Sequence, residues 1–351
     1  MSKLTKSSSS VIKPLSGFRR YLLDKIRLLI NRYERLMLTN FPSTYRMLQM
    51  FTVGTKEFSY DVFEYMRISK DLAIDKSVQD LTYKELMIYM KTPKDIRKMT
   101  PFLLITALPL AQYVSIPLAF TFPKQLLSSH YWTIQQRTKF SIDDHRRKLY
   151  HYRPLFRSLQ KRLDSIESPY LREKCRYVFT RLGSGTHPNV DDIIHLKPLF
   201  IEQPFGLRSL SQQHLVHLCR THGLRRLFLF KRRSLFQHIT FIQAMDSHLF
   251  DSDLSFEQLR QACFLRGLNP INLTQQEMFD WLQQWQQISK NVDDHTISLL
   301  LHTPLFLAYN HPSNWREYLT TNVTLSIADF NNSTTFSCDS FSTLTPFTDI
   351  N

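Results

Sequence analysis

LSQQHLVHLCRTHGL (residues 210–224) and LSFEQLRQACFLRGL (residues 254–268) carry leucine, serine, leucine, cysteine, glycine and leucine at six corresponding positions. Ser211 and Ser255 stand where the N-cap of a helix is expected, because a serine hydroxyl can accept a hydrogen bond from the first turn. Gly223 and Gly267 stand where a left-handed residue commonly ends a helix. The repeated pattern therefore predicts two similar, short, capped helices.

The repeated cysteine has two interpretations, a reactive thiol flanked by charge or a packing residue. Cys219 and Cys263 each lie four residues after a leucine, on the same helix face, where cysteine acts as a small apolar side chain. A catalytic nucleophile would not be duplicated at a core position. The pattern favours packing, and no catalytic residue is predicted.

Motifs for metals and cofactors are scarce. The four cysteines form no CxxC pair, which argues against a zinc site or a disulfide framework. His214 and His217 are the only tightly spaced histidines on a predicted helix, and we interpret them as polar positions of that helix. No phosphate loop, hydrolase or metalloprotease motif is present. We expect no metal, no cofactor, no small-molecule substrate and no enzymatic activity.

The composition favours a helical, basic protein. The 351 residues include 45 Lys+Arg, 30 Asp+Glu and only 7 glycines. Few glycines disfavour tight hairpins, and long Leu/Arg/Gln-rich stretches favour helices. The net charge of +15 suits nucleic acid, anionic lipid or an acidic partner.

The chain begins with a basic, serine-rich and then amphipathic segment at 1–38, a composition typical of mitochondrial targeting sequences. A basic disordered terminus is the alternative interpretation. Residues 39–98 are predicted to be helical and membrane-proximal, with Thr82 and Glu85 spaced as a capping box. Residues 311–351 are rich in Ser, Thr and Asn and are predicted to be a disordered tail.

Residues 99–123 are predicted to form one transmembrane helix. Residues 101–122 contain no charged residue, and a helix of that length reaches across the roughly 30 Å hydrocarbon core. Pro109 and Pro117 lie inside this segment and should kink it, which frees carbonyl groups that need partners. An oligomeric bundle, a water-lined path and a simple kinked anchor remain open.

Two basic clusters follow the predicted span, within a predicted domain at 124–310. The first contains Arg146, Arg147, Lys148, Arg153, Arg157, Lys161 and Arg162 with no acidic residue between them. The second is RRLFLFKRR at 225–233, and we select its cations as ribosome- or anion-binding candidates: Arg225, Arg226, Lys231, Arg232 and Arg233. Cations interleaved with apolar residues suit RNA or an anionic membrane surface. A solvated helix face is the alternative.

The proline-containing stretch TPFLLITALPLAQYVSIPLAFTFPKQLLSSHYW (100–132) resembles the membrane segment of the LETM family, the leucine-zipper/EF-hand-containing transmembrane proteins. LSFEQLRQACFLRGLNPINLTQQEMFDWLQQWQQ (254–287) resembles that family's LxxACxxRG unit and the Trp-containing helix that follows it. LTYKELMIYM and GTHPNVDDI are similar to short members that lack the long C-terminal extension. The resemblance covers roughly 40–305.

This resemblance implies a single-pass protein of the mitochondrial inner membrane, with an all-helical ribosome-binding domain in the matrix. It implies mitochondrial ribosomes (protein or rRNA) and inner-membrane lipids as partners, and the prolines of the membrane segment allow a homo-oligomer through it. Support of translation, respiratory-chain assembly and membrane organisation would follow. The alternative is a part in potassium/proton or calcium/proton exchange. The chain departs from the family in lacking an EF-hand loop and a long coiled-coil extension.

Overall fold

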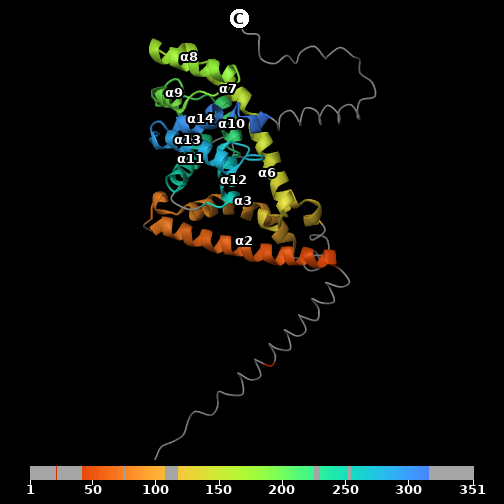
Figure 1. Cartoon of the computed structure of the whole chain (residues 1–351). Helices are drawn as coiled ribbons and strands as arrows, with labels where there is room; N and C mark the ends of the chain where they lie inside the picture. The colour runs from red at the N-terminus through yellow and green to blue at the C-terminus, as the bar shows by residue number, and fades with distance from the viewer. Residues whose placement is uncertain are drawn as a thin grey trace, which may run out of the picture. The chain divides into compact units, whose positions relative to one another are not determined.

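The structure is a computed structural model that describes residues 21, 42–74, 76–106, 118–224, 230–250 and 254–315 (Figure 1). Within these ranges the regular elements are all helical, which confirms the prediction of a mainly α protein. The same ranges hold no helix that combines the length and the apolarity needed to cross a bilayer. Pro109 and Pro117, most of the predicted targeting segment and most of the predicted tail lie outside the described residues.

The helices follow one another along the chain with short connections. Their bounds are α2 Pro42–Ile74, η1 Val78–Asp80, α3 Tyr83–Thr106, α5 Pro123–Leu126, η2 Ser129–Tyr131, α6 Ile134–Leu149, α7 Tyr152–Gln160, η3 Leu163–Ser165, α8 Pro169–Gly183, α9 Val190–His195, η4 Lys197–Phe200, α10 Gln212–Thr221, α11 Lys231–Ser247, α12 Phe256–Arg266, α13 Gln275–Lys290 and α14 Ile297–Ala308.

The chain divides into two compact units, with divisions within α2, within α3 and between η2 and α6. Unit 1 comprises Met1–Phe63 and Asp95–Trp132, and unit 2 comprises Glu64–Lys94 and Thr133–Asn351. In unit 1 a small core forms around Phe58, Met99 and Phe102, which are all buried.

Unit 2 is built around α14, whose twelve residues are all buried. A helix that is apolar on every side must be enclosed by others. Helices α11 and α13 pack directly on it (Figure 1). The sequence LLLHTPLFLA therefore becomes the centre of the unit, and the remaining helices present their apolar faces to it.

The two repeated stretches fold as capped helices, as predicted. The Ser211 and Ser255 hydroxyls accept hydrogen bonds from the backbone N–H groups three residues on, those of His214 and Gln258, at 3.3 and 3.4 Å. Gly223 and Gly267 have φ values of 67° and 96°. The next leucine in each copy donates its N–H back to the cysteine carbonyl, at 2.7 Å after Gly223 and 3.0 Å after Gly267. These bonds satisfy carbonyl groups that each helix end leaves open.

The repeated cysteines are packing residues. Cys219 and Cys263 are buried. Burial raises the pKa of the Cys219 thiol to about 11 and that of the Cys263 thiol to about 12. A thiol with a raised pKa and no solvent access is a poor nucleophile, so the structure supports the packing interpretation.

A buried ion pair joins the second copy to its neighbours. Arg266, at the end of α12, donates to Asp246 Oδ1 of α11 from Nε at 2.9 Å and from Nη2 at 2.6 Å. The other carboxylate oxygen accepts from Trp285 Nε1 at 2.9 Å and Ser289 Oγ at 2.6 Å, both on α13. Because every oxygen is bonded, the burial of this charge is compensated. The network fixes three helices together.

Candidate functional site

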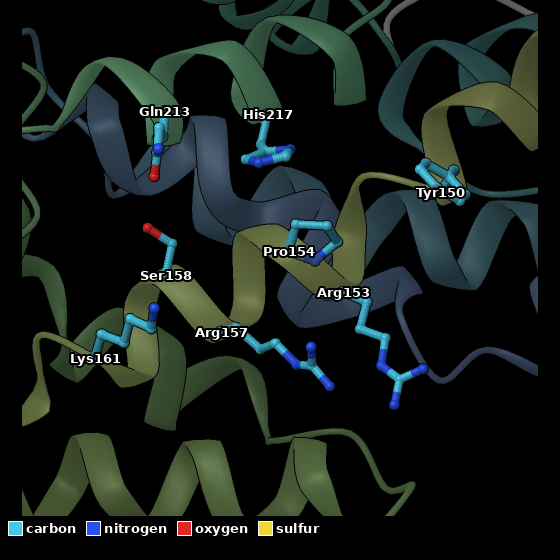
Figure 2. Close-up of a pocket in the computed structure, with 8 residues that line it drawn as sticks. All are labelled: Tyr150, Arg153, Pro154, Arg157, Ser158, Lys161, Gln213 and His217. Atoms are coloured by element: carbon cyan, nitrogen blue, oxygen red, sulfur yellow. The ribbon is translucent and has the colours of Figure 1, made fainter. Parts of the chain in front are cut away.

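Unit 2 contains a surface groove of about 530 Å³ between α7 and α10, two helices that pack on each other. Its walls come from the turn before α7, from α7 itself and from one face of α10 (Figure 2). The lining residues are Tyr150, Arg153, Pro154, Arg157, Ser158, Lys161, Gln213 and His217. None of these eight is acidic, so the groove has a positive potential.

Three cations form a row along α7. Arg153, Arg157 and Lys161 recur at intervals of four residues and are all exposed. Each interval advances about 6 Å along a helix, so the row extends over about 12 Å. The opposite face of α7 is buried through Tyr152, Leu155, Phe156 and Leu159. This strongly amphipathic pattern holds the helix in place and keeps the cations outside. In Figure 2 the two arginine side chains extend in the same direction from α7.

The facing wall comes from α10. Gln213 and His217 lie one turn apart and face α7 across the groove (Figure 2). His217 Nδ1 lies 3.3 Å from Nδ1 of His151, which immediately precedes α7. Burial and the nearby Arg220 lower the pKa of both rings, to about 4 for His151. At neutral pH these rings are uncharged and share one proton between the two facing nitrogens.

Ser158, in the middle of the groove, is connected to the core through a chain of histidines. Its Oγ lies 2.8 Å from His214 Nδ1, and His214 Nε2 lies 2.7 Å from His302 Nε2. His302 Nδ1 lies 2.7 Å from the Ser298 carbonyl. Burial lowers the pKa of His214 to about 2 and that of His302 to about 4, so both rings are neutral.

The carbonyl at the inner end fixes the direction of this chain. A carbonyl can only accept, so His302 carries its proton on Nδ1 and accepts at Nε2. His214 must then donate from Nε2 and accept at Nδ1. The remaining donor is the Ser158 hydroxyl, whose proton is therefore directed into the core. The oxygen of Ser158 presents only acceptor lone pairs to the groove.

Other cations of the first basic cluster are used in folding. Arg162 donates to the carbonyls of Pro204 at 2.6 Å and Ser209 at 3.2 Å. Lys148 donates to the Phe264 carbonyl at 3.2 Å, and burial lowers its pKa to about 8. Of the seven cations in this cluster, Arg153, Arg157 and Lys161 line the groove.

The cations predicted as binding candidates in 225–233 have mixed environments. Arg225 and Arg226 lie outside the described residues. Lys231 is buried. Arg232 donates to the carbonyls of Leu207 at 3.2 Å and Leu210 at 2.9 Å, a folding role that the sequence did not indicate. Arg233 is exposed. A binding role for this cluster stays a prediction, with Arg233 its most accessible described member.

His214 is not the polar helix-face position that was predicted, because its ring is completely buried, whereas His217 is half-buried at the groove. His214 faces Ser158 and His302 inside the core, whereas His217 faces His151 at the groove. The two rings therefore do not converge on one point. Across the described part of the chain, no three His, Cys, Asp or Glu side chains gather as a metal site would require.

A Ser–His–Asp chain occurs in unit 1 and has a structural explanation. His130 lies 3.1 Å from Ser128 Oγ through Nδ1 and 2.9 Å from Asp61 Oδ2 through Nε2. Ser128 is completely buried at the start of η2. A hydroxyl in that position cannot reach a substrate, so the chain links η2 to α2 within the unit.

Sequence reasoning found the cations of α7 but missed the other wall. Gln213, His217 and Tyr150 carry no motif, and Ser158 is an ordinary helical serine in the sequence. The available signal was the four-residue spacing of Arg153, Arg157 and Lys161. The α10 wall depends on packing between segments more than fifty residues apart, which no local pattern encodes.

Known proteins resemble this chain over most of its length. The family model described as "LETM1-like, RBD" matches residues 81–306. LETM1 domain-containing protein 1 of Xenopus tropicalis is 29% identical over 297 residues, which cover 83% of this chain and 84% of the relative. The human protein of the same name is 28% identical over 316 residues, covering 88% and 87%.

A further relative is the mitochondrial proton/calcium exchanger protein of Drosophila melanogaster, 25% identical over 240 residues. The match covers 65% of this chain and 23% of that protein. The family model runs from just before α3 into α14, and it includes both walls of the groove. Since this match covers more than half of the sequence, the chain belongs to the LETM1-like family.

Proposed function

We propose that this protein binds mitochondrial ribosomes through the basic groove between α7 and α10. The observation that carries the proposal is the row of Arg153, Arg157 and Lys161 in a groove without an acidic lining residue. Ribosomes present a dense array of phosphates, and cations at regular spacing on a rigid helix suit that surface. The family model's description, in which RBD denotes a ribosome-binding domain, supports the same partner.

We propose the mitochondrial inner membrane as the location, with the domain that follows the apolar segment, residues 124–310, in the matrix. Residues 1–38 have a targeting composition, and residues 101–122 form an uncharged, apolar stretch long enough to span a bilayer. The Drosophila relative is named as a mitochondrial protein. A membrane anchor beside a ribosome-binding unit would hold translation close to the membrane, where respiratory-chain subunits are inserted.

The test is co-sedimentation of the full-length protein, in detergent micelles, with purified mitochondrial ribosomes. The double variant Arg157→Glu/Lys161→Glu reverses two groove cations and should lose at least tenfold in affinity, with a weaker dependence on salt. The matched control is Arg176→Glu/Lys290→Glu, which makes the same charge change at exposed positions outside the groove. The control should bind like the unmodified protein.

The two basic clusters can be separated in the same assay. Arg233→Glu alone tests the second cluster at its exposed described residue. If that change abolishes binding while the groove double variant binds normally, the groove is not the ribosome site. Equal losses in the groove variant and the control pair would mean that only net charge matters, which would also overturn the proposal.

Ion exchange is the second candidate, and the name of the Drosophila relative favours it. Pro109 and Pro117 would kink the apolar segment and expose carbonyl groups to a cation path. Homo-oligomers would be required, because one helix cannot enclose a path. Proton-coupled potassium or calcium flux in liposomes that contain only this protein, lost in Pro109→Ala/Pro117→Ala, would establish this function. A flux no greater than that of empty liposomes would exclude ion exchange as a function of this protein alone.

A further inference from the structure

We infer that the groove between α7 and α10 binds an RNA strand and that Ser158 recognises a ribose 2′-hydroxyl. This inference rests on the proposed ribosome-binding function and deepens it. It identifies rRNA, rather than a ribosomal protein, as the ligand of this site. It also assigns a specificity role to a side chain that has no charge.

The acceptor character of Ser158 carries the inference. An exposed serine can rotate its hydroxyl to donate or accept, and so discriminates poorly between ligands. Here the proton is committed to His214 Nδ1 at 2.8 Å, and the His214–His302 pair is fixed from behind by the Ser298 carbonyl. The groove therefore presents an oriented acceptor. It requires a donor from the ligand, and a phosphate or a carboxylate offers none.

The remaining lining residues match the other parts of a ribonucleotide. Arg153 and Arg157 lie on one side of Ser158 along α7 and Lys161 follows it, so that cations flank the acceptor. Their spacing of about 6 Å is comparable to that of successive phosphates along a strand. Tyr150, 68% exposed at the end of the groove, offers a ring face on which a base can stack.

This combination separates RNA from the other anionic ligands. DNA supplies phosphates and bases but lacks the 2′-hydroxyl that would donate to Ser158. An anionic headgroup would engage one or two cations and would leave the row and the Tyr150 ring unused. An acidic peptide would satisfy the cations, and a backbone N–H could donate to Ser158, but it would offer no base to stack on the Tyr150 ring. A ribonucleotide chain uses the cation row, the Ser158 acceptor and the Tyr150 ring together.

The experiment compares three labelled single strands of one sequence, binding to the full-length protein in detergent, by fluorescence anisotropy. The strands are RNA, the 2′-deoxy strand and the 2′-O-methyl strand, which keeps the phosphates but removes the donor. One hydrogen bond should make RNA bind about three- to tenfold more tightly than either of the others. Equal affinities for the three strands would overturn the inference, whatever their absolute strength.

Two variants assign the preference to Ser158. Ser158→Ala removes the acceptor and should lower RNA affinity to the level of the deoxy strand, which itself should not change. Ser158→Cys keeps a weak donor for His214 but supplies a poor acceptor, and it should lose the preference while retaining the fold. Circular dichroism monitors folding. A preference that persists in Ser158→Cys would refute the role of this residue.

The outcomes separate this inference from the proposed function. If Arg157→Glu/Lys161→Glu abolishes ribosome binding but the three strands bind equally, the groove binds ribosomes by charge alone and the inference fails. If ribosome binding ignores that double variant, the proposed function fails. Competition of anionic lipid vesicles with the RNA strand at equal phosphate concentration would indicate a membrane surface, and it would overturn RNA as the ligand.

Discussion

The two repeated stretches share one frame, a capped helix with a buried cysteine and a terminal glycine, but their other side chains have different roles. Both begin with a serine cap, bury a cysteine and end with a left-handed glycine. In the first copy, Gln213 and His217 point into the basic groove. In the second, Arg266 points into the core, where it pairs with Asp246. The same capped helix therefore forms a binding wall in one place and anchors a buried ion pair in the other.

This difference teaches that the positions between the caps, and not the caps, distinguish the two copies. The residue before the glycine shows it most clearly. In the first copy it is His222, whose Nε2 donates to the Leu301 carbonyl at 2.9 Å. In the second it is Arg266, which bonds to a carboxylate. Variants in equivalent positions of the two copies should therefore have unequal effects.

The largest effect is expected when the ion pair of the second copy is broken. Asp246→Ala leaves Arg266 charged and buried without a partner, and it also frees Trp285 Nε1 and Ser289 Oγ. Such losses cost about 3–5 kcal/mol in the free energy of unfolding. Urea denaturation followed by far-UV circular dichroism measures it. Glu257→Ala, in the exposed pair of the same helix, is the control and should cost less than about 1 kcal/mol.

A loss below about 1 kcal/mol for Asp246→Ala would contradict the assignment of this pair as the anchor of α11, α12 and α13. It would mean that water reaches Arg266 in the variant and solvates its charge. The two copies would then differ less in burial than their geometry indicates.

The glycines of the two copies should respond unequally to the same change. Gly223→Ala places a methyl group at positive φ, which costs about 1–2 kcal/mol, and its nearest neighbour is the flexible Lys148 side chain at 3.1 Å. Gly267→Ala adds overlap with the Tyr152 hydroxyl and contact with Pro304, for about 1–3 kcal/mol more. Thermal unfolding of both variants measures the difference. Equal losses of stability in the two variants would show that the side chains around Tyr152 can move aside at little energetic cost.

The frame itself was predictable from the sequence because its causes are local. A serine caps the turn that follows it, and a glycine relieves the backbone at its own position, so Ser211, Ser255, Gly223 and Gly267 reveal their roles in the printed sequence. The overall helical class follows from the same kind of local preference.

The partners of particular side chains were not predictable, because they depend on packing between distant segments. Arg266 and Arg232 look like ordinary surface arginines in the sequence, yet one is completely buried and the other bonds to carbonyls of a loop. The cation row on α7 was visible as spacing. The facing wall of α10 and the direction of the Ser158 hydroxyl required the tertiary structure.

Acid should act on the first copy through its own buried His222, whereas the fifteen residues of the second copy include no histidine. Burial lowers the pKa of His222 to about 4, whereas an unfolded histidine titrates near 6.5. Below about pH 6.5 the unfolded chain therefore binds a proton that the folded protein excludes, so stability falls as pH falls towards 4. At pH 7 this contribution is absent.

His222→Gln tests the sign and size of this effect. The glutamine amide can still donate to the Leu301 carbonyl, but it cannot titrate. The loss of stability between about pH 7 and about pH 5 should shrink by about 2 kcal/mol in this variant. His195→Gln, at an exposed position of α9, is the control and should leave the pH profile unchanged. An unaltered profile in His222→Gln would place the acid sensitivity elsewhere.

The smallest stability effects are expected at the caps, where they give the sharpest functional contrast. Ser211→Ala and Ser255→Ala each remove one hydrogen bond to the first turn, worth about 1 kcal/mol. The first turn of α10 carries Gln213, so Ser211→Ala should also weaken ribosome binding by loosening that wall of the groove. Ser255→Ala, with a similar loss of stability, should bind ribosomes normally, because α12 lies outside the groove lining. Equal binding losses in the two variants would mean that binding follows global stability and not the geometry of the α10 wall.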